Sequence, residues 1–304
     1  MSSSAALHRS AALASISVAL LLVGLKIWAV LSTGSTAMLG SLADTTLDLV
    51  ASVATLAGVW VAAQPADESH RFGHGKAEAL AAMFQVVLIS ISALTLAFRA
   101  IDQWIAGTRP EGAEGGIAVS LIAMAATFAL LVWQRRVIRQ TGSLAISTDH
   151  VHYQSDLFLN LAVIAALALD QYAGIAGADP FFGLAIALWL GWGAWGASQA
   201  AIEQLMDKEW PDDRRAAFLD AAARHPEIKG LHDLRTRTSA DRDFVQFPLA
   251  VDPDMTVRQA HVVMDEVEAI LHKEFPGLEI LIHPDPEGHV DENDLSSEDL
   301  LAKR

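Results

Sequence analysis

The chain has 304 residues, of which 52% are hydrophobic, with a mean hydropathy of +0.33 and no cysteine. This hydrophobic content exceeds what a water-soluble domain of this size needs and is typical of a membrane protein. The missing cysteines exclude disulfides and thiolate metal ligands, and a formal charge of −15 argues against binding to nucleic acid.

Six apolar segments follow one another along the chain, each near or above the roughly 20 residues that cross a bilayer. They occupy residues 11–32, 37–63, 78–106, 115–136, 144–169 and 180–202. We therefore predict a six-helix transmembrane domain over residues 1–206, a soluble domain over 207–290 and an acidic, disordered tail over 291–304. No charged region with a small-residue cleavage site precedes the first segment, so we expect this segment to be retained.

Cations concentrate before the first segment and in alternate connections: Arg9, Arg71, Lys76, Arg135, Arg136 and Arg139. The other connections contain a single cation, Arg109. By the positive-inside rule, both termini and the cation-bearing connections are expected to be cytoplasmic. The pattern predicts a multi-pass protein of the plasma membrane, which in bacteria is the inner membrane.

Two of the apolar segments carry pairs of metal-ligand side chains four residues apart: Asp44 with Asp48, and His152 with Asp156. Residues at i and i+4 share one helix face. An ionisable group at the bilayer centre costs about 2.5–3.5 kcal/mol on insertion scales, so four such groups indicate a function. Counted from opposite membrane faces at 1.5 Å per residue, the two pairs reach a similar depth.

Three carboxylates and one imidazole at that depth predict a tetrahedral site for a divalent transition metal. The structural alternative is that each acid caps a helix kink or pairs with a lysine. Lys26 in the first segment can serve one acid but not all three. Because metal binds deprotonated ligands, its arrival would displace protons, and one site that alternately holds metal or protons is enough for an antiporter.

The pairs Asp44-x3-Asp48 and His152-x3-Asp156 resemble the transport site of the cation diffusion facilitator family. The surrounding stretches 40–44 and 152–156 are similar to its bacterial zinc, cadmium and ferrous-iron efflux branch, and the resemblance extends to about residue 286. It implies a homodimeric exporter that exchanges a divalent cation for protons by alternating access. The imidazole implies Zn, Fe(II) or Cd as substrate rather than Mn, in agreement with ligand softness.

A second cluster of metal-capable groups lies between the second and third segments and comprises Asp67, His70 and His74. A polar loop can also hold solvated histidines that bind nothing. The stretch resembles the loop site of the same family, and three ligands with an open fourth position suit a labile or regulatory ion. Lys76 and Asp207 resemble a family charge pair that joins the two domains, although Lys76 can equally snorkel alone.

From about residue 209 the pattern becomes that of a small α+β domain. Helices are predicted over 212–224 and from Thr256 to about 274, and strands over 231–238, 244–251 and 278–283. The order α-β-β-α-β indicates a split βαβ, ferredoxin-like sandwich with helices on one face of the sheet.

This domain contains His232, His261, His283 and Asp285, which resemble the binuclear cytoplasmic metal site of the family. Pro248 stands where the family pattern has another histidine. Because proline offers no ligand, we expect weakened or single-metal occupancy. Proline also suits an edge strand or a strand end.

Asp149 lies seven residues before Asp156 on the same predicted helix face. It is a candidate for cation access or proton relay, or an interfacial helix-end residue, and is not counted among the ligands. His225, His272 and His289 match no motif and are expected on the surface.

Other functions fit the pattern less well. An enzyme would need an open metal position beside a general base, and His-Glu-x-x-His is absent, so we expect neither catalysis nor a resident cofactor. A metal-selective channel would favour weak binding at several sites. A membrane metal sensor would concentrate its ligands in the soluble domain. Channel and sensor remain the alternatives to export.

Overall fold

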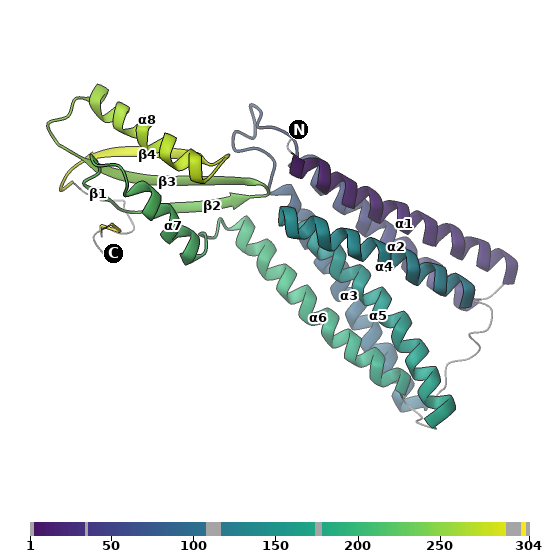
Figure 1. Ribbon diagram of the computed structural model, residues 1–304. Helices are drawn as coiled ribbons and strands as arrows, with labels where there is room; N and C mark the ends of the chain where they lie inside the picture. Colours follow the sequence, from purple (N-terminus) through teal and green to yellow (C-terminus); the bar gives the residue numbers. More distant parts are fainter. Residues whose placement is uncertain (1–2, 34–35, 108–116, 174–177, 290–298, 302–304) are drawn as a thin grey trace. The chain divides into compact units, whose positions relative to one another are not determined.

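The computed structural model describes residues 3–33, 36–107, 117–173, 178–289 and 299–301. The chain divides into two compact units, residues 1–202 and residues 203–304. Among the described residues, the first unit is helical and the second combines two helices with a sheet (Figure 1).

The helices of the first unit follow the predicted apolar segments. They are α1 (Ser3–Thr33), α2 (Thr36–Ala62), α3 (Ala77–Ala106), α4 (Ile117–Thr141), α5 (Leu144–Ala173) and α6 (Ala178–Leu205). In the described part of the chain, five contain stretches long and apolar enough to cross a membrane: Ala6–Leu31, Asp44–Ala62, Ala77–Ala106, Leu121–Thr141 and Pro180–Leu205. Large apolar side chains such as Phe98 and Trp192 are exposed on these helices, as expected where a helix faces lipid.

The helix α5 coincides with the remaining apolar segment but is less uniformly apolar than the other five. Its first half carries Asp149, His150, His152 and Asp156, and the first and third of these side chains are buried. Five of the six predicted spans therefore have a matching apolar helix, and α5 as a sixth span stays a prediction.

Small residues allow the helices to approach closely at one end of the bundle. A Cβ on Gly58 of α2 would come 2.4 Å from the Cβ of Ala81 and 3.2 Å from the carbonyl oxygen of Ala77, both on α3. Only glycine fits at this distance. The same end is filled by a core cluster drawn from α1 to α5, comprising Ala11, Val59, Ala81, Val137, Ala145 and Ile146.

The second unit has the elements α7 (Asp212–Ala222), β1 (Gly230–Leu231), β2 (Arg235–Ser239), β3 (Arg242–Val251), α8 (Val257–Glu274) and β4 (Glu279–Pro286). The predicted first strand is split into β1 and β2, and Asp233 between them has a φ of 40°, which takes the backbone out of extended geometry. The start of α8 agrees with prediction because Thr256 and Gln259 form a reciprocal capping box.

The strand β3 lies at the centre of the sheet. It pairs antiparallel with β1 and β2 on one side and parallel with β4 on the other. Pairing with β2 ends at Gln246 and pairing with β1 begins at Leu249, so Pro248 has no registered partner in either strand. Proline was expected at an edge or a strand end, but it lies within a central strand, opposite an interruption of the neighbouring strand. Because the neighbouring strand is interrupted there, no backbone N–H is needed at position 248 for pairing on that side.

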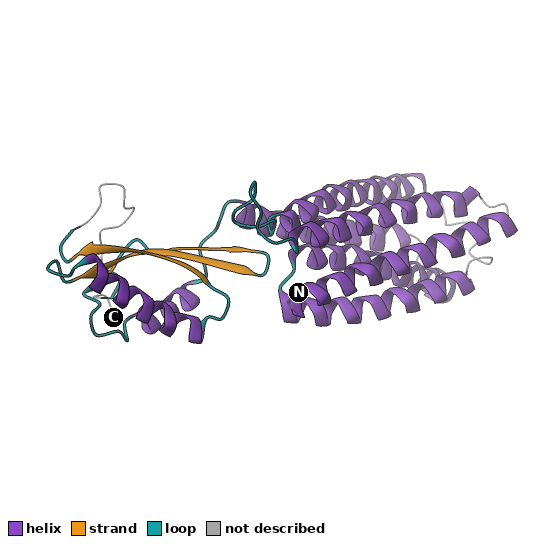
Figure 2. Ribbon diagram, turned by 90° about the horizontal axis from the view of Figure 1, so that it is seen from above, coloured by secondary structure: helices purple, strands orange, loops and turns teal. Residues whose placement is uncertain are grey.

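Both helices of the second unit cover the same face of the sheet (Figure 2). Every second residue of β3 from Val245 to Val251 enters a core that includes Phe218 of α7 and Val267 of α8. This is the predicted arrangement of helices on one face, while the ferredoxin-like topology as a whole stays a prediction.

Three residues of the C-terminal tail contact the sheet. The backbone N–H of Leu300 donates to the carbonyl oxygen of Leu231 (2.8 Å), and the N–H of Leu231 donates to Oδ1 of Asp299 (3.2 Å). Leu300 and Leu301 pack against the core of this unit. Residues 299–301 therefore hold a defined position within the segment that was expected to be disordered.

Candidate metal centres

The first candidate centre joins α2 to α5 inside the helical unit. Nε2 of His152 lies 2.8 Å from Oδ1 of Asp48. With Asp156 these residues form a group whose potential ligand atoms all lie within 4.8 Å of one another. His152 is buried, while Asp48 and Asp156 are partly buried. One imidazole and two carboxylates this close form a ligand set that suits a divalent transition metal. A bound cation would also offset the repulsion between the two carboxylates.

Local hydrogen bonds within α5 support the two ligands it carries. Oγ of Ser155 donates to the backbone carbonyl oxygen of His152 (2.5 Å), and Nδ2 of Asn160 donates to the backbone carbonyl oxygen of Asp156 (2.7 Å). The ring of Tyr153 lies edge-on to that of His152 with centroids 5.8 Å apart. The ring contact of Tyr153 limits the rotation of the His152 side chain, while the two hydrogen bonds engage the backbone of α5 at the ligand positions.

Asp44, the fourth predicted ligand, is exposed one helical turn before Asp48 and does not belong to this group. Lys26 of α1 donates to Oγ1 of Thr45 and interacts electrostatically with Asp44, Asp48 and Asp156. The ammonium therefore balances part of the negative charge of these carboxylates. A ligand role for Asp44 stays a prediction.

The second candidate centre lies in the connection between α2 and α3. Oδ1 of Asp67 lies 3.4 Å from Nδ1 of His70, and Oδ2 of Asp67 lies 3.4 Å from Nε2 of His74. The two imidazole rings are 4.4 Å apart. All three potential ligand atoms fall within 4.8 Å of one another. Gly73 makes this possible because its φ of 82° turns the chain between the histidines.

Asp67 is fixed by its own loop. Its Oδ1 accepts hydrogen bonds from the backbone N–H of His70 (2.6 Å), the N–H of Ser69 (2.9 Å) and Oγ of Ser69 (3.1 Å). The His70 N–H is the main cause, and Ser69 a further one, of a pKa for Asp67 below its ordinary value of 3.8. The carboxylate is therefore ionised and oriented before any metal arrives.

Two of the three predicted histidine ligands of the second unit lie near Asp285. Its buried carboxylate lies 3.3 Å from Nε2 of His283 and 3.6 Å from Nε2 of His232. His232 comes from the interruption between β1 and β2, and His283 pairs in register with Pro248. His261 is exposed on α8, where its nearest acid is Asp265 at 3.8 Å.

The predicted charge pair belongs to two units whose relative placement is not determined. Lys76 precedes α3 in the first unit, and Asp207 follows α6 in the second. Within its own unit, Oδ2 of Asp207 lies 3.6 Å from Nη1 of Arg237. Pairing of Lys76 with Asp207 stays a prediction.

The environment of Asp149, and a buried cluster of His8, Glu78 and Ser143, were not predicted from the sequence. Asp149 is fully buried and accepts hydrogen bonds from three other helices, so it is not an interfacial helix-end residue. Nδ1 of His8 lies 3.0 Å from Oε1 of Glu78, whose Oε2 accepts a hydrogen bond from Oγ of Ser143 (2.7 Å). The available signal was the presence of polar residues inside apolar segments.

His225 was also misplaced by the sequence analysis. It was expected on the surface, but its side chain is buried and its Nε2 lies 2.7 Å from Oε2 of Glu266 on α8. The imidazole thus links the end of α7 to α8 rather than lying in solvent.

Comparison with known proteins gives a family match for each of the two units. The family model "Cation efflux transmembrane domain" matches residues 12–206, and "Cation efflux protein, cytoplasmic domain" matches residues 210–287. The cation-efflux pump FieF of Serratia proteamaculans (strain 568) is 42% identical over 282 residues, which is 93% of this chain and 94% of the relative. FieF of Cronobacter sakazakii (strain ATCC BAA-894) is 42% identical over 276 residues, covering 91% and 92%. A solved structure of CzrB in its zinc form is 39% identical over 28% of this chain and 98% of that chain, with a TM-score of 0.25.

Proposed function

The chain belongs to the cation efflux family, and from this premise we propose that it exports a divalent transition-metal cation through the centre formed by Asp48, His152 and Asp156. The family membership supports a multi-pass cation-efflux transporter, and we propose that the chain is not an enzyme. We propose Asp44 as a further ligand that joins the centre when the cation binds.

The proximity of His152 and Asp48 is the observation that supports this proposal best. A 2.8 Å contact between helices holds an imidazole against a carboxylate, with a second carboxylate within 4.8 Å. This mixed nitrogen and oxygen set suits Zn or Fe(II), and also Cd, better than the oxygen-only sets that harder ions prefer. The cation is the substrate, held transiently and released on the other side.

Export is proposed to be coupled to protons. Metal ligands must be deprotonated to bind, so a centre with one imidazole and at least two carboxylates loses protons when the cation arrives. Reprotonation from the outside would then eject the cation. In this scheme the helices expose the centre to one side of the membrane at a time, and α5 is the sixth span.

The orientation follows from the arginines that end α4. Arg135, Arg136 and Arg139 lie near the start of α5, and by the positive-inside rule this end is proposed to be cytoplasmic, together with both termini. In a bacterium the membrane would be the inner one. The match to a cytoplasmic domain of the cation efflux proteins supports a homodimer assembled through the second unit.

The remaining clusters are proposed as auxiliary metal sites. Asp67, His70 and His74 would bind a labile ion at the proposed cytoplasmic end. His232, His283 and Asp285, with His261 as a possible further ligand, would bind a regulatory ion in the second unit, weakened by Pro248. Lys76 and Asp207 are proposed to link the two units electrostatically.

The test is cation uptake by proteoliposomes that contain the full chain, measured separately for Zn, Fe(II), Cd and Mn. Asp48→Ala should abolish uptake, while Asp102→Ala, which removes an exposed carboxylate of α3 outside the centre, should leave it unchanged. Uptake that survives Asp48→Ala would contradict the assignment of the centre. Cation binding without any uptake in the unmodified protein would instead support a metal sensor.

A further inference from the structure

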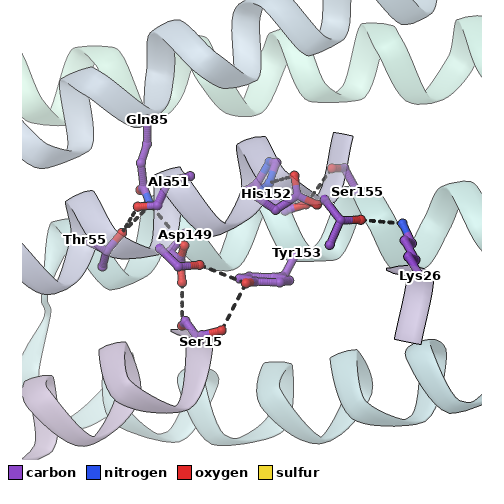
Figure 3. A network of polar contacts seen from close by, with 12 residues as sticks. Ser15, Lys26, Ala51, Thr55, Gln85, Asp149, His152, Tyr153 and Ser155 are labelled. Carbon is purple, nitrogen blue, oxygen red and sulfur yellow. Dashed lines mark hydrogen bonds and ion pairs between the residues drawn. The ribbon is translucent and has the colours of Figure 1, made fainter. Parts of the chain in front are cut away.

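Asp149 on α5 is a buried carboxylate bonded to three other helices. Its Oδ2 accepts a hydrogen bond from Oγ of Ser15 on α1 (2.7 Å), and its Oδ1 accepts one from Nε2 of Gln85 on α3 (3.0 Å) (Figure 3). Oδ2 also accepts a hydrogen bond from Nε2 of Gln134 on α4 (2.8 Å). Asp149 and Gln134 are 0% exposed, and Ser15 and Gln85 are 1% exposed. The carboxylate thus lies in a buried layer and accepts hydrogen bonds from neutral donors.

The same layer continues to α2. Nε2 of Gln85 also donates to Oγ1 of Thr55, and the hydroxyl of Tyr153 lies 2.9 Å from Oγ of Ser52 and donates to the carbonyl oxygen of Ser15 (3.2 Å). Figure 3 shows the side chains of Thr55, Gln85 and Asp149 turned toward one another, with Tyr153 and Ser15 beside them. A connected polar network therefore links α1, α2, α3, α4 and α5 at a single level.

This network lies between the metal centre and one end of the bundle. Asp149 precedes His152 by three residues, so it is about 4.5 Å closer to the start of α5. That end carries the arginines of α4 and is the proposed cytoplasmic end. On the opposite side of the centre, Asp44 is exposed. The helices are thus closely packed on the side of the metal centre where Asp149 lies.

Separating α5 from its neighbours would break several of these hydrogen bonds together. A buried charge that loses its donors is costly, and hydrogen bonds to charged groups contribute more than neutral ones. The carboxylate therefore favours one compact arrangement of the helices. Motion that opens a path to the cytoplasmic end must separate Ser15 and Gln134 from Asp149 or carry them along as one body.

We propose that Asp149 is a positioning residue of the transport cycle, whose hydrogen bonds close the bundle between the metal centre and the proposed cytoplasmic end. The inference rests on the proposed export function. It assigns Asp149 no contact with the cation: Asp149 acts through the helices that it holds together.

The test uses the natural absence of cysteine, which allows a single reporter to be introduced. Ala19 on α1 is 1% exposed and lies one helical turn beyond Ser15, on the side of the metal centre. In an Ala19→Cys background, a membrane-impermeant thiol reagent is applied separately to right-side-out and inside-out vesicles. Asp149→Asn should raise the modification rate from the cytoplasmic side about tenfold or more, as expected when hydrogen bonds to a buried charge are lost.

Asp149→Asn disrupts the network because it replaces one acceptor oxygen by an N–H donor. An asparagine directs an N–H toward Ser15 and Gln134 or toward Gln85, and Gln134 is held in orientation by Nδ1 of His150, 3.1 Å from its Oε1. Thr148→Ala is the matched control, because that hydroxyl donates within α5, to the carbonyl oxygen of Leu144 (3.0 Å). The control should leave the rate unchanged on both sides.

Ser15→Ala provides a milder variant, since it removes one donor from another helix without changing charge. Ser15→Ala should raise the modification rate from the cytoplasmic side by a smaller factor than Asp149→Asn does. If Asp149→Asn does not fold, Ser15→Ala replaces it in the test. A rise from both sides, which general loosening would produce, or rates equal to those of Thr148→Ala would overturn the inference. Labelling requires no cation flux. The uptake experiment therefore tests export, and the labelling experiment tests independently whether Asp149 keeps the bundle closed.

Discussion

Asp48 on α2 and His152 on α5 are 104 positions apart in the sequence, yet Oδ1 of the first lies 2.8 Å from Nε2 of the second. This contact fixes the rotation of two helices about their axes. It also brings Asp156, one turn further along α5, into the same group. The predictions below start from this arrangement and from the two clusters outside it.

The imidazole is expected to set the choice of cation. His152→Asp replaces a nitrogen ligand by oxygen and leaves a set of carboxylates, which suits harder ions. We expect uptake of Zn by proteoliposomes to fall at least about tenfold relative to Mn, equivalent to about 1.4 kcal/mol of discrimination. An unchanged order of ions would show that selectivity lies elsewhere.

Metal binding at the loop cluster is expected to weaken on acidification because of its histidines and not because of Asp67. Hydrogen bonds lower the pKa of Asp67 below 3.8, so its stabilising contribution is present above that value and is lost only as the pH falls below it. The imidazoles of His70 and His74 bind metal through an unprotonated ring nitrogen, so protons compete with the metal at these ligands.

A metal titration of the full chain in detergent at several pH values checks this. The loop contribution, isolated by comparison with His70→Ala, should disappear on acidification while the pH is still above the ordinary aspartate value of 3.8. Asp67→Asn should reduce affinity at every pH without moving the midpoint of the loss. A midpoint below pH 3.8 would assign the transition to the carboxylate of Asp67 and contradict the prediction.

Restoring an imidazole at position 248 is expected to strengthen metal binding in the second unit. Pro248 pairs in register with His283, whose Nε2 lies 3.3 Å from Asp285. Pro248→His should tighten binding by about tenfold or more, or add one bound metal per chain. Titration in the presence and absence of Asp285→Ala identifies the site, and identical binding by Pro248→His and the unmodified chain would argue against a ligand position there.

Close packing of α2 on α3 is expected to be sensitive at Gly58. Gly58→Ala would place a Cβ 2.4 Å from that of Ala81, and such overpacking costs about 1–3 kcal/mol. Thermal unfolding in detergent should therefore shift downward. Gly24→Ala is the control, because a Cβ at Gly24 of α1 meets nothing within 4 Å, and alanine favours helix. Equal stability of the two variants would contradict the close approach.

Some of this structure could be predicted from the sequence because it depends on local periodicity. The spacing of Asp44 with Asp48, and of His152 with Asp156, identifies one face on each of two helices. The turn around Gly73 places Asp67, His70 and His74 together without any distant partner. Capping by Thr256 marks the start of α8 to the residue.

Other features depend on which faces of distant helices meet, and periodicity does not determine that. Ser15, Gln85 and Gln134 are single polar residues in apolar segments, and only packing shows that all three converge on Asp149. The left-handed φ of Asp233 splits a strand whose apolar pattern looked continuous. The contact of Leu300 with Leu231 arises from a sheet edge that the sequence does not reveal.

The most direct test of proton-coupled export is Zn uptake by proteoliposomes with an acidic lumen and a neutral exterior, compared with uptake at equal pH. We predict rapid uptake with the gradient, collapse of that uptake when an ionophore dissipates the gradient, and none in Asp48→Ala under either condition. Uptake that follows the membrane potential and ignores the pH gradient would indicate a channel and contradict exchange of the cation for protons.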